Sequence, residues 1–233
     1  MTRHPLPCPR RPPAFRLQLS FSPRPPHPAH CGVPSASSLF LSDPPAATLS
    51  QVSGGECTAA ELGVRFRSSQ PGFVTAIRFW KAGMDSADYE GRLYSRSGAL
   101  LGSTGPASLV GAGWSELPFA APVRIEAGFI YVAAYYSASG NYAYTLGGRD
   151  GSLSVAADSP PLRAAPAGED GPNGILFSGR GGGFPRTAPA VPGTNFWADV
   201  VFVAETDQSA PRSPPSVAAT VPRPNAAAVA VAR

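Results

Sequence analysis

The residue types that most often carry out acid–base and nucleophilic chemistry are missing from the centre of this 233-residue sequence. All three histidines, His4, His27 and His30, precede residue 38, and residues 51–204 contain none. Because Ser–His and Cys–His nucleophiles and His-ligated zinc all need an imidazole in the site, this chemistry is excluded from the central segment. A pair of carboxylates that hydrolyses a glycoside stays open, since the separation of the two groups in space decides that reaction.

Aromatic rings are the strongest candidates for ligand binding. Exposed rings stack on the C–H faces of a sugar, while arginine and amide groups hydrogen-bond its hydroxyls. The predicted ligand-binding residues lie on or beside predicted strands and are Trp80, Arg78, Arg92, Tyr94 and Trp197. This set predicts weak binding of a neutral polysaccharide or glycan on a surface patch that includes Trp80. The alternative is that each ring belongs to the core, where large rings are often buried.

An acidic turn over residues 168–174, GEDGPNG, is the predicted metal site. Glu169, Asp170 and Asn173 offer oxygen ligands on a glycine-bearing turn, and calcium prefers such ligands. The stretch does not have the spacing of a known calcium loop, so ordinary solvated turn residues are the alternative. Calcium is the one cofactor considered, and otherwise none is predicted.

The clearest strand pattern runs over residues 59–80, AAELGVRFRSSQPGFVTAIRFW. Apolar and polar residues alternate over 62–67 and again over 73–80, and this period of two places successive side chains on opposite faces of a strand. Pro71 presets φ and Gly72 accepts a positive φ, so the residues between the two runs predict a chain reversal. We therefore expect a β-hairpin that buries its apolar face against a second sheet.

The second half of this stretch defines the expected core face. One face carries Phe73, Thr75, Ile77 and Phe79, and the other carries Val74, Ala76, Arg78 and Trp80. We predict that Ile77 and Phe79 point into the core, because burying both Arg78 and Trp80 beside them would be unfavourable.

Shorter strand signals follow, separated by turn residues. The predicted strands cover residues 39–41, 92–95, 100–104, 114–119, 123–125, 129–136 and 195–203, with short runs at 142–146, 153–156 and 175–178. Residues 129–136, FIYVAAYY, are apolar on both faces and predict a strand in the centre of its sheet. Because hardly any helical pattern is present, the sequence predicts an all-β fold, an antiparallel β-sandwich of jelly-roll-like form.

Composition divides the chain into three parts. Residues 1–37 are rich in proline and arginine and residues 205–233 in alanine and proline, so we expect two disordered tails around a β-sandwich domain over residues 38–204. The leader has no recognisable signal peptide, and no apolar run is long enough to span a membrane. Residues 51–204 hold 11 Lys+Arg against 12 Asp+Glu, so the net charge of +4 lies in the tails and the centre lacks a basic surplus for binding nucleic acid.

Five segments in order resemble one family of domains. They are ELGVRFRSSQPGFVTAIRFWKAG, GRLYSRSGALLGS, GWSELPFAAPVRIEAGFIYVAAYY, GEDGPNGILFSGRGGGFP and TNFWADVVF. From about Leu39 to Val203 the sequence is similar to a bacterial-type domain of unknown function found in large secreted multi-module proteins, beside cadherin-like and fibronectin-like sandwich modules. The resemblance implies an extracellular or cell-surface location, and a monomer or one module of a larger protein. Polysaccharide binding or adhesion is implied only through these neighbours.

Three functional hypotheses follow. The first is a non-catalytic extracellular binding module, either glycan-binding or adhesive. The second is a structural spacer or protein-interaction module with no small ligand, and the third is a carboxylate-dependent glycoside-processing enzyme. Exposed rings beside polar groups would indicate the first, their absence the second, and a deep cleft holding two carboxylates the third.

Overall fold

The computed structural model describes residues 35–45, 48–51, 59–83 and 87–205. These residues form strands joined by turns and loops, and none of them forms a helix that is long and apolar enough to span a membrane. Most of the two predicted tails, residues 1–34 and 206–233, lies outside the described residues. The strand β1 (Ala36–Ser37) belongs to the fold, so the folded domain begins slightly before the predicted residue 38.

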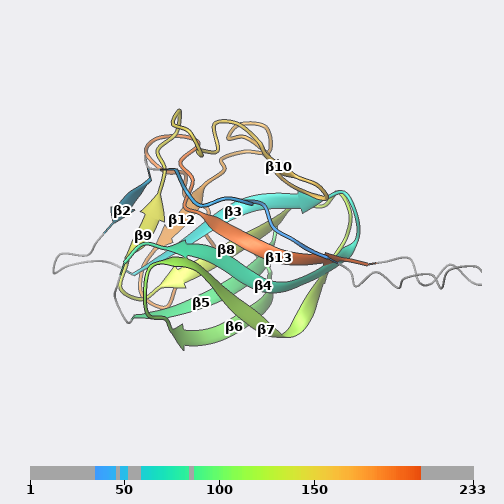
Figure 1. The fold of residues 1–233 in the computed structure, drawn as a ribbon, viewed down its shortest axis with the longest axis horizontal. Coiled ribbons are helices and arrows are strands. Elements are labelled where there is room, and N and C mark those ends of the chain that lie inside the picture. Colours follow the sequence, from blue (N-terminus) through green and yellow to red (C-terminus); the bar gives the residue numbers. More distant parts are fainter. Residues whose placement is uncertain (1–34, 46–47, 52–58, 84–86, 206–233) are drawn as a thin grey trace, which may run out of the picture. The chain divides into compact units, whose positions relative to one another are not determined.

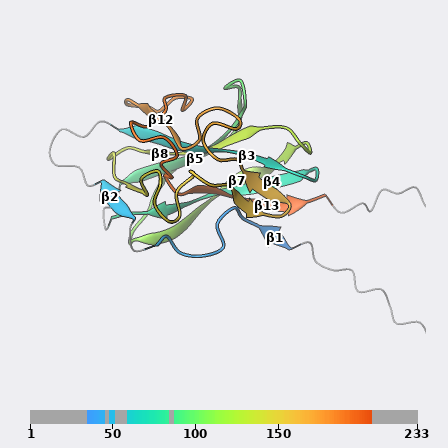
Figure 2. The ribbon, with the colours of Figure 1, turned by 90° about the horizontal axis from the view of Figure 1, so that it is seen from above.

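Two antiparallel sheets pack against each other, which confirms the expected β-sandwich (Figure 1 and Figure 2). The smaller sheet has the order β1, β13 (Ala198–Ala204), β4 (Gly72–Lys81) and β7 (Gly113–Ile125). The larger sheet has the order β10 (Ala157–Ser159), β11 (Leu162–Ala164), β3 (Ala60–Ser68), β8 (Tyr131–Ser137), β5 (Asp88–Ser95) and β6 (Leu100–Ser108). The strand β12 (Ile175–Ser178) also pairs with β3, and β2 (Leu49–Gln51) pairs with β9 (Tyr142–Tyr144) in a separate two-stranded sheet. The chain crosses repeatedly between the two main sheets, as in a jelly roll.

The strands β3 and β4 follow each other along the chain but belong to different sheets, so the predicted hairpin is wrong. The neighbours of β4 are β13 and β7, whereas β3 pairs with β8. The turn at Pro71 reverses the chain as expected, but it carries the chain from one sheet to the other. The physical reason is burial, because the apolar faces of β3 and β4 contribute to one core between the sheets.

A β-bulge in β4 changes the predicted core face. The pairing of β4 with β13 skips one residue, Thr75, and an extra residue of this kind reverses the alternation of side chains along a strand. Ile77 and Phe79 are fully buried, which confirms their predicted direction. Phe73, on the other side of the bulge, is only partly buried, so the prediction of one continuous core face is wrong for the start of the strand.

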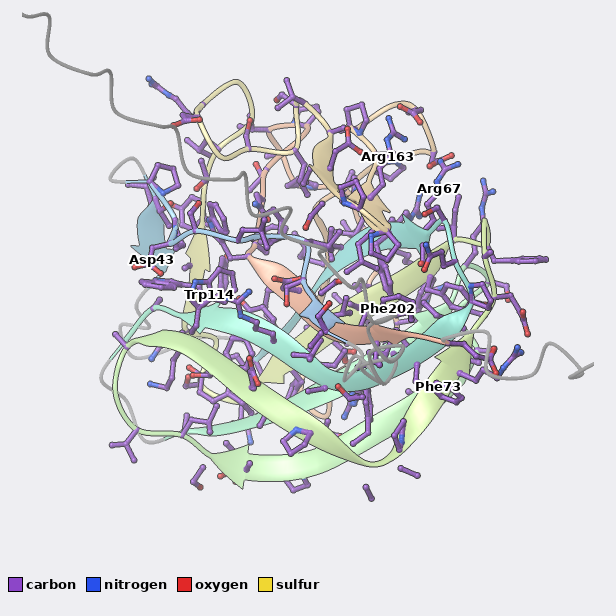
Figure 3. All side chains as sticks on the ribbon, turned by 45° about the vertical axis from the view of Figure 1, so that its right-hand side comes forward. Asp43, Arg67, Phe73, Trp114, Arg163 and Phe202 are labelled. Carbon is purple, nitrogen blue, oxygen red and sulfur yellow. The ribbon has the colours of Figure 1, made fainter. Side chains whose placement is uncertain are left out.

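A group of aromatic rings forms the centre of the core. The ring centroid of Phe79 lies 4.2 Å from that of Tyr135 in β8, in a stacked arrangement, and 5.2 Å from that of Tyr89 in β5. The Tyr135 hydroxyl donates a hydrogen bond to the Phe196 carbonyl at 3.1 Å, which satisfies this buried polar group. Side chains of both sheets thus fill the space between them (Figure 3), and β8 occupies the central position that its sequence predicts.

Several predicted strands are replaced by other arrangements. Residues 39–41 form no strand, because Asp199 accepts the N–H groups of Leu39 and Phe40 at 2.7 and 3.2 Å and takes the place of a neighbouring strand. The two strands predicted within residues 114–125 are one strand, β7, which loses its regular register with β4 near the predicted turn. The run over 153–156 forms turns, while β10 and β11 have no counterpart among the predictions.

Candidate functional site

Trp197 is a core residue, so its predicted role as an exposed sugar-stacking ring is wrong. Only 3% of its surface is exposed, and its ring packs against Phe40 and Trp114 at centroid distances of 5.0 and 6.3 Å. The indole Nε1 donates a hydrogen bond to Thr145 Oγ1 at 2.9 Å, which satisfies its polar edge inside the fold. Its backbone has a φ of 54°, and the Asn195 side chain holds this left-handed conformation by accepting the Trp197 N–H at 2.8 Å.

Trp80 and Arg78 lie together on the outer face of β4. Trp80 is partly exposed and meets Trp114 edge-on, with ring centroids 5.6 Å apart. The Arg78 guanidinium lies 3.7 Å from the Trp114 ring centroid and donates hydrogen bonds to the Phe40 carbonyl at 2.8 Å and to Asp199 Oδ2 at 3.1 Å. Burial raises the pKa of Asp199 to about 6, although its backbone hydrogen bonds and Arg78 favour the charged form. Arg78 is therefore committed to the fold, and Trp80 alone keeps the exposure that a ligand contact needs.

Arg92 and Tyr94 lie on the larger sheet, where they hold the buried carboxylate of Glu61. Arg92 Nη1 donates to Glu61 Oε2 at 2.6 Å, and the Tyr94 hydroxyl donates to Glu61 Oε1 at 2.7 Å. The N–H of Gly183 adds a third hydrogen bond at 2.8 Å, so the group fastens the glycine-rich loop over residues 179–184 to the sheet. Burial raises the pKa of Glu61, and these hydrogen bonds oppose that rise. The prediction that these two residues share a ligand site with Trp80 is therefore wrong.

Asn173 is a structural residue, and its prediction as a metal ligand is wrong. It is 2% exposed, and its Oδ1 accepts the N–H groups of Arg65 and Gly174 at 2.8 and 2.9 Å. Its Nδ2 donates to the carbonyls of Arg65 and Ala165 at 3.0 and 2.8 Å. The amide fills the gap between β12 and β11 along the same edge of β3, so it pairs with the Arg65 backbone as a strand would. Both acceptor positions of its oxygen are in use, which leaves none for a cation.

Glu169 and Asp170, the other predicted metal ligands, are directed toward arginines. Asp170 is bonded to Arg67 Nη2, and Glu169 accepts two hydrogen bonds from Arg163 at 2.6 and 2.9 Å. These bonds from Arg163 lower the pKa of Glu169. Within the described ranges of the chain, no group of three or more His, Cys, Asp or Glu side chains is placed to hold a metal ion. The calcium hypothesis stays a prediction, and this turn gives it no support.

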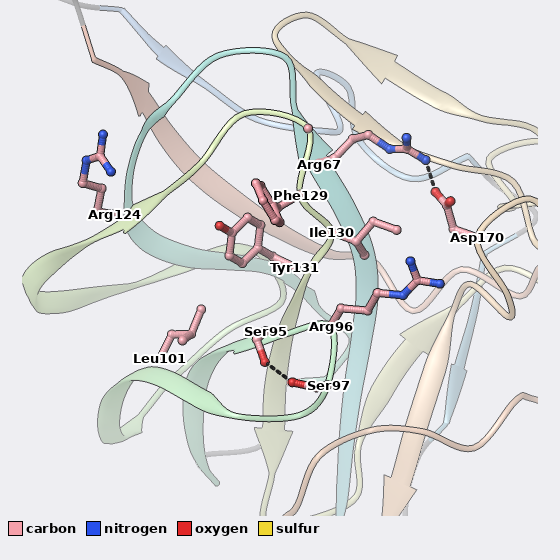
Figure 4. Close-up of a pocket in the computed structure, with 11 residues that line it drawn as sticks. Arg67, Ser95, Arg96, Ser97, Leu101, Arg124, Phe129, Ile130, Tyr131 and Asp170 are labelled. Carbon is pink, nitrogen blue, oxygen red and sulfur yellow. Dashed lines mark hydrogen bonds and ion pairs between the residues drawn. The ribbon is translucent and has the colours of Figure 1, made fainter.

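An open groove at one end of the larger sheet brings together a different set of residues (Figure 4). It lies where β3 and β5 end and where β6 and β8 begin, and its volume is about 880 Å³. The connections between β5 and β6 and between β7 and β8 contribute five of its eleven lining residues. The side chains that matter for ligand binding are Arg67, Arg96, Arg124, Phe129, Tyr131 and Asp170. Loops at the end of a sandwich are a common place for binding sites, because the sheets hold them rigidly while their sequences vary.

Three arginines and one aspartate line this groove, which gives its lining a surplus of two positive charges. Arg67 is paired with Asp170, and Arg124 is paired with two glutamates. The exposed Arg96 makes no hydrogen bond or ion pair with any other residue that the structure describes. Burial and then repulsion by Arg96 lower the pKa of the neighbouring Arg65. Arg65 Nε is itself buried without a hydrogen-bond partner among the described residues.

Phe129 adds an apolar surface to the groove. Its ring is 64% exposed and lies beside Tyr131 (Figure 4), and Leu101 is a further exposed apolar residue of the lining. The Tyr131 hydroxyl accepts the N–H of Glu126 at 2.9 Å, which fixes the orientation of this second ring. The sequence predicts an exposed ring and a guanidinium in one site around Trp80. The structure instead has an exposed ring, Phe129, in the same groove as Arg96, at the larger sheet.

The fold and the groove define an antiparallel β-sandwich domain with an arginine-lined groove at one end of its larger sheet. Residues 46–198 match the family described as Domain of unknown function (DUF4082), and the chain belongs to this family. The resemblance to a domain of unknown function is thereby confirmed, whereas the expected neighbouring modules stay a prediction. No curated protein matches the chain.

The groove could not be predicted from the sequence for two different reasons. The strand predicted over residues 129–136 includes Phe129, whereas β8 begins at Tyr131 and Phe129 follows the preceding turn. Gly128, with a φ of 78°, is the signal that identifies this turn. The closeness of Arg96 to Arg65 has no comparable signal, because it depends on β3 and β5 flanking the same strand, β8.

Proposed function

We propose that this domain is a non-catalytic glycan-binding module of an extracellular or cell-surface protein, and that its ligand lies in the groove. The observation that supports the proposal best is the exposed Phe129 ring in the same groove as the Arg96 guanidinium, which pairs with no residue in the part of the chain that the structure describes. Such a ring stacks on the C–H face of a sugar, and a guanidinium offers five N–H donors to its oxygen atoms. The extracellular setting, beside cadherin-like and fibronectin-like modules, is supported by the resemblance of the five ordered segments.

The dimensions of the groove favour part of a polymer over an enclosed small molecule. Its volume of about 880 Å³ lies within the usual range for ligand sites, and the groove is open to solvent. An open site buries limited surface, and sugar hydroxyls exchange good hydrogen bonds with water for similar bonds with protein. We therefore expect dissociation constants between about 1 μM and about 1 mM.

The charged groups of the groove favour binding without hydrolysis. Asp170 is the one carboxylate among its described lining residues, and it is already paired with Arg67. Glycoside hydrolysis by the usual mechanism needs two carboxylates that flank the scissile bond, one of which must donate a proton. Nearby arginines stabilise the charged form of a carboxyl group, so a carboxyl group in this lining would stay ionised and could not donate that proton.

A glycan array probed with the full-length chain tests the proposal, with and without calcium. Phe129→Ala is expected to weaken binding to any glycan hit by roughly fivefold or more, the loss of one ring-stacking contact. Val110→Ala, which truncates a residue 84% exposed beyond the opposite end of β6, is the control and is expected to bind normally. Both variants are expected to keep the thermal midpoint of the parent, because both side chains are exposed. If no glycan binds, the spacer hypothesis replaces this one. If a glycan binds Phe129→Ala as tightly as it binds the parent, the groove is refuted as the binding site.

A further inference from the structure

We infer that the glycan is acidic, and that its carboxylate or sulfate group binds Arg96 while its sugar ring lies on Phe129. This inference rests on the proposed function and adds to it the charge of the ligand. It replaces the neutral glycan that the sequence predicts around Trp80, because Arg78 beside Trp80 is committed to Asp199 and to the Phe40 carbonyl.

The charges around Arg96 do not balance. Among the described residues, Arg65, Arg67, Arg96 and Arg163 form one cluster of cations, and the anions that interact with them are Asp158, Glu169 and Asp170. Four positive charges against three negative ones leave a surplus of one. Each anion of the cluster is bonded to Arg67 or Arg163, and Arg65 Nη1 donates a hydrogen bond to the Asp170 carbonyl at 3.0 Å. The surplus positive charge therefore falls on Arg96.

An anionic ligand group corrects this imbalance, whereas a hydroxyl does not. Arg96 and Arg65 repel each other, and a negative charge beside Arg96 would attract both cations and so offset that repulsion. A guanidinium also matches a carboxylate or sulfate geometrically, since two parallel N–H groups can bond to two oxygens at once. Arg96 is exposed in the turn between β5 and β6, so it can adjust to the ligand without disturbing the sheet.

The apolar part of the groove makes an acidic sugar a better occupant than an acidic peptide. Phe129 is 64% exposed and Leu101 is 41% exposed, so both offer surface to the C–H face of a sugar ring. The exposed Ser97, next to Arg96, adds a hydroxyl that can exchange hydrogen bonds with those of a sugar. Stacking on Phe129 and charge pairing with Arg96 would then act on one ligand that extends along the groove.

Matched pairs of glycans test the inference with the full-length chain. One pair is oligogalacturonate and its methyl ester, and the other is chondroitin sulfate and its desulfated form, each titrated calorimetrically. The parent is expected to bind the charged member of at least one pair about tenfold more tightly than its partner, the size expected for a charge-assisted hydrogen bond. The pair whose charged member binds more tightly identifies the acidic group as a carboxylate or a sulfate. The difference in affinity between the two members is expected to decrease as salt is added.

Variants of two exposed arginines separate a role in binding from a general effect of charge. Arg96→Gln is expected to remove most of the preference for the charged glycan, and Arg96→Lys to retain part of it, because lysine keeps the charge but loses the bidentate geometry. Arg149→Gln is the control, since Arg149 is exposed in a loop that follows β9 and its side chain pairs with no described residue. Equal thermal midpoints for the three variants would establish that each is folded.

The outcomes distinguish this inference from the proposed function. If charged and neutral glycans bind equally and Phe129→Ala weakens both, the glycan-binding function stands and the acidic ligand is refuted. If polyglutamate binds as tightly as the charged glycans, the groove selects charge without a sugar and both the inference and the proposed function fail. If none of these probes binds, both fail as well.

Discussion

Two phenylalanines of β4 are expected to respond very differently to truncation because a bulge at Thr75 lies between them. Phe79 is fully buried, with Tyr135 and Tyr89 against its ring. Loss of the ring removes about 1.5–3 kcal/mol of apolar burial, and each aromatic contact contributes about 0.5–1.5 kcal/mol more. With the cavity that remains, Phe79→Ala is expected to cost about 3–5 kcal/mol of unfolding free energy.

Phe73 lies on the other side of the bulge, partly exposed beside Thr75, Pro122 and Val203. Phe73→Ala is expected to cost about 1 kcal/mol, since much of the lost surface is already in contact with water. Urea unfolding of the full-length chain and both variants, followed by tryptophan fluorescence, gives the two values from the midpoints at constant slope. Similar costs for the two variants would refute the reasoning, because an uninterrupted strand would place both rings on one face.

Three further predictions concern buried or paired polar groups. Because burial raises the pKa of Asp199 from 3.8 to about 6, its protonated form stabilises the folded state fully below pH 3.8, and this stabilisation is lost as the pH rises through about 6. Between about pH 3 and about pH 7, the unfolding free energy of the parent should therefore fall by about 3 kcal/mol relative to that of Asp199→Asn. Urea titrations at each pH check this, and parallel profiles would contradict it. Gly182→Ala should cost about 1–2 kcal/mol in the same assay, because Gly182 has a φ of 71° and an added Cβ would meet Arg92 and Glu61. Calcium and a chelator should both leave the thermal midpoint unchanged, because Asp170 is bonded to an arginine, and a midpoint raised by calcium would revive the calcium hypothesis.

Alternation along the sequence identifies strands but not their partners. The pattern over residues 59–80 correctly predicts two strands and a reversal at Pro71, yet a turn of this kind fits both a hairpin and a crossing between sheets. The difference depends on which other strands cover the apolar faces, and those strands lie far along the chain. The bulge at Thr75 is equally hard to predict, because it is defined by the pairing of β4 with β7 and with β13, and β13 lies more than a hundred residues away.

The candidate site was less predictable than the fold because burial of a side chain in a loop has no periodic signal. Trp197 immediately precedes β13 and resembles an exposed ring by sequence, but a left-handed backbone turns it into the core. Asn173 resembles a calcium ligand by its neighbours, whereas its amide replaces a missing stretch of strand beside Arg65. Residue type alone could identify Phe129 and Arg96 as candidate binding residues, but only the order of the strands brings them into one groove.

The pairing of β1 with β13 has a mechanical consequence. Ala36 lies opposite Val203, so the first and last strands of the described domain have their outer ends side by side (Figure 2). A pull on those two ends would load the hydrogen bonds of this antiparallel pair one after another, like a zipper, and not all together in shear. The short β1 would therefore peel away at low force while β13 stayed anchored to β4 through seven paired positions. The same closeness of the two ends would let a host protein carry the domain as a side branch in a surface loop, shielded from tension along its own backbone.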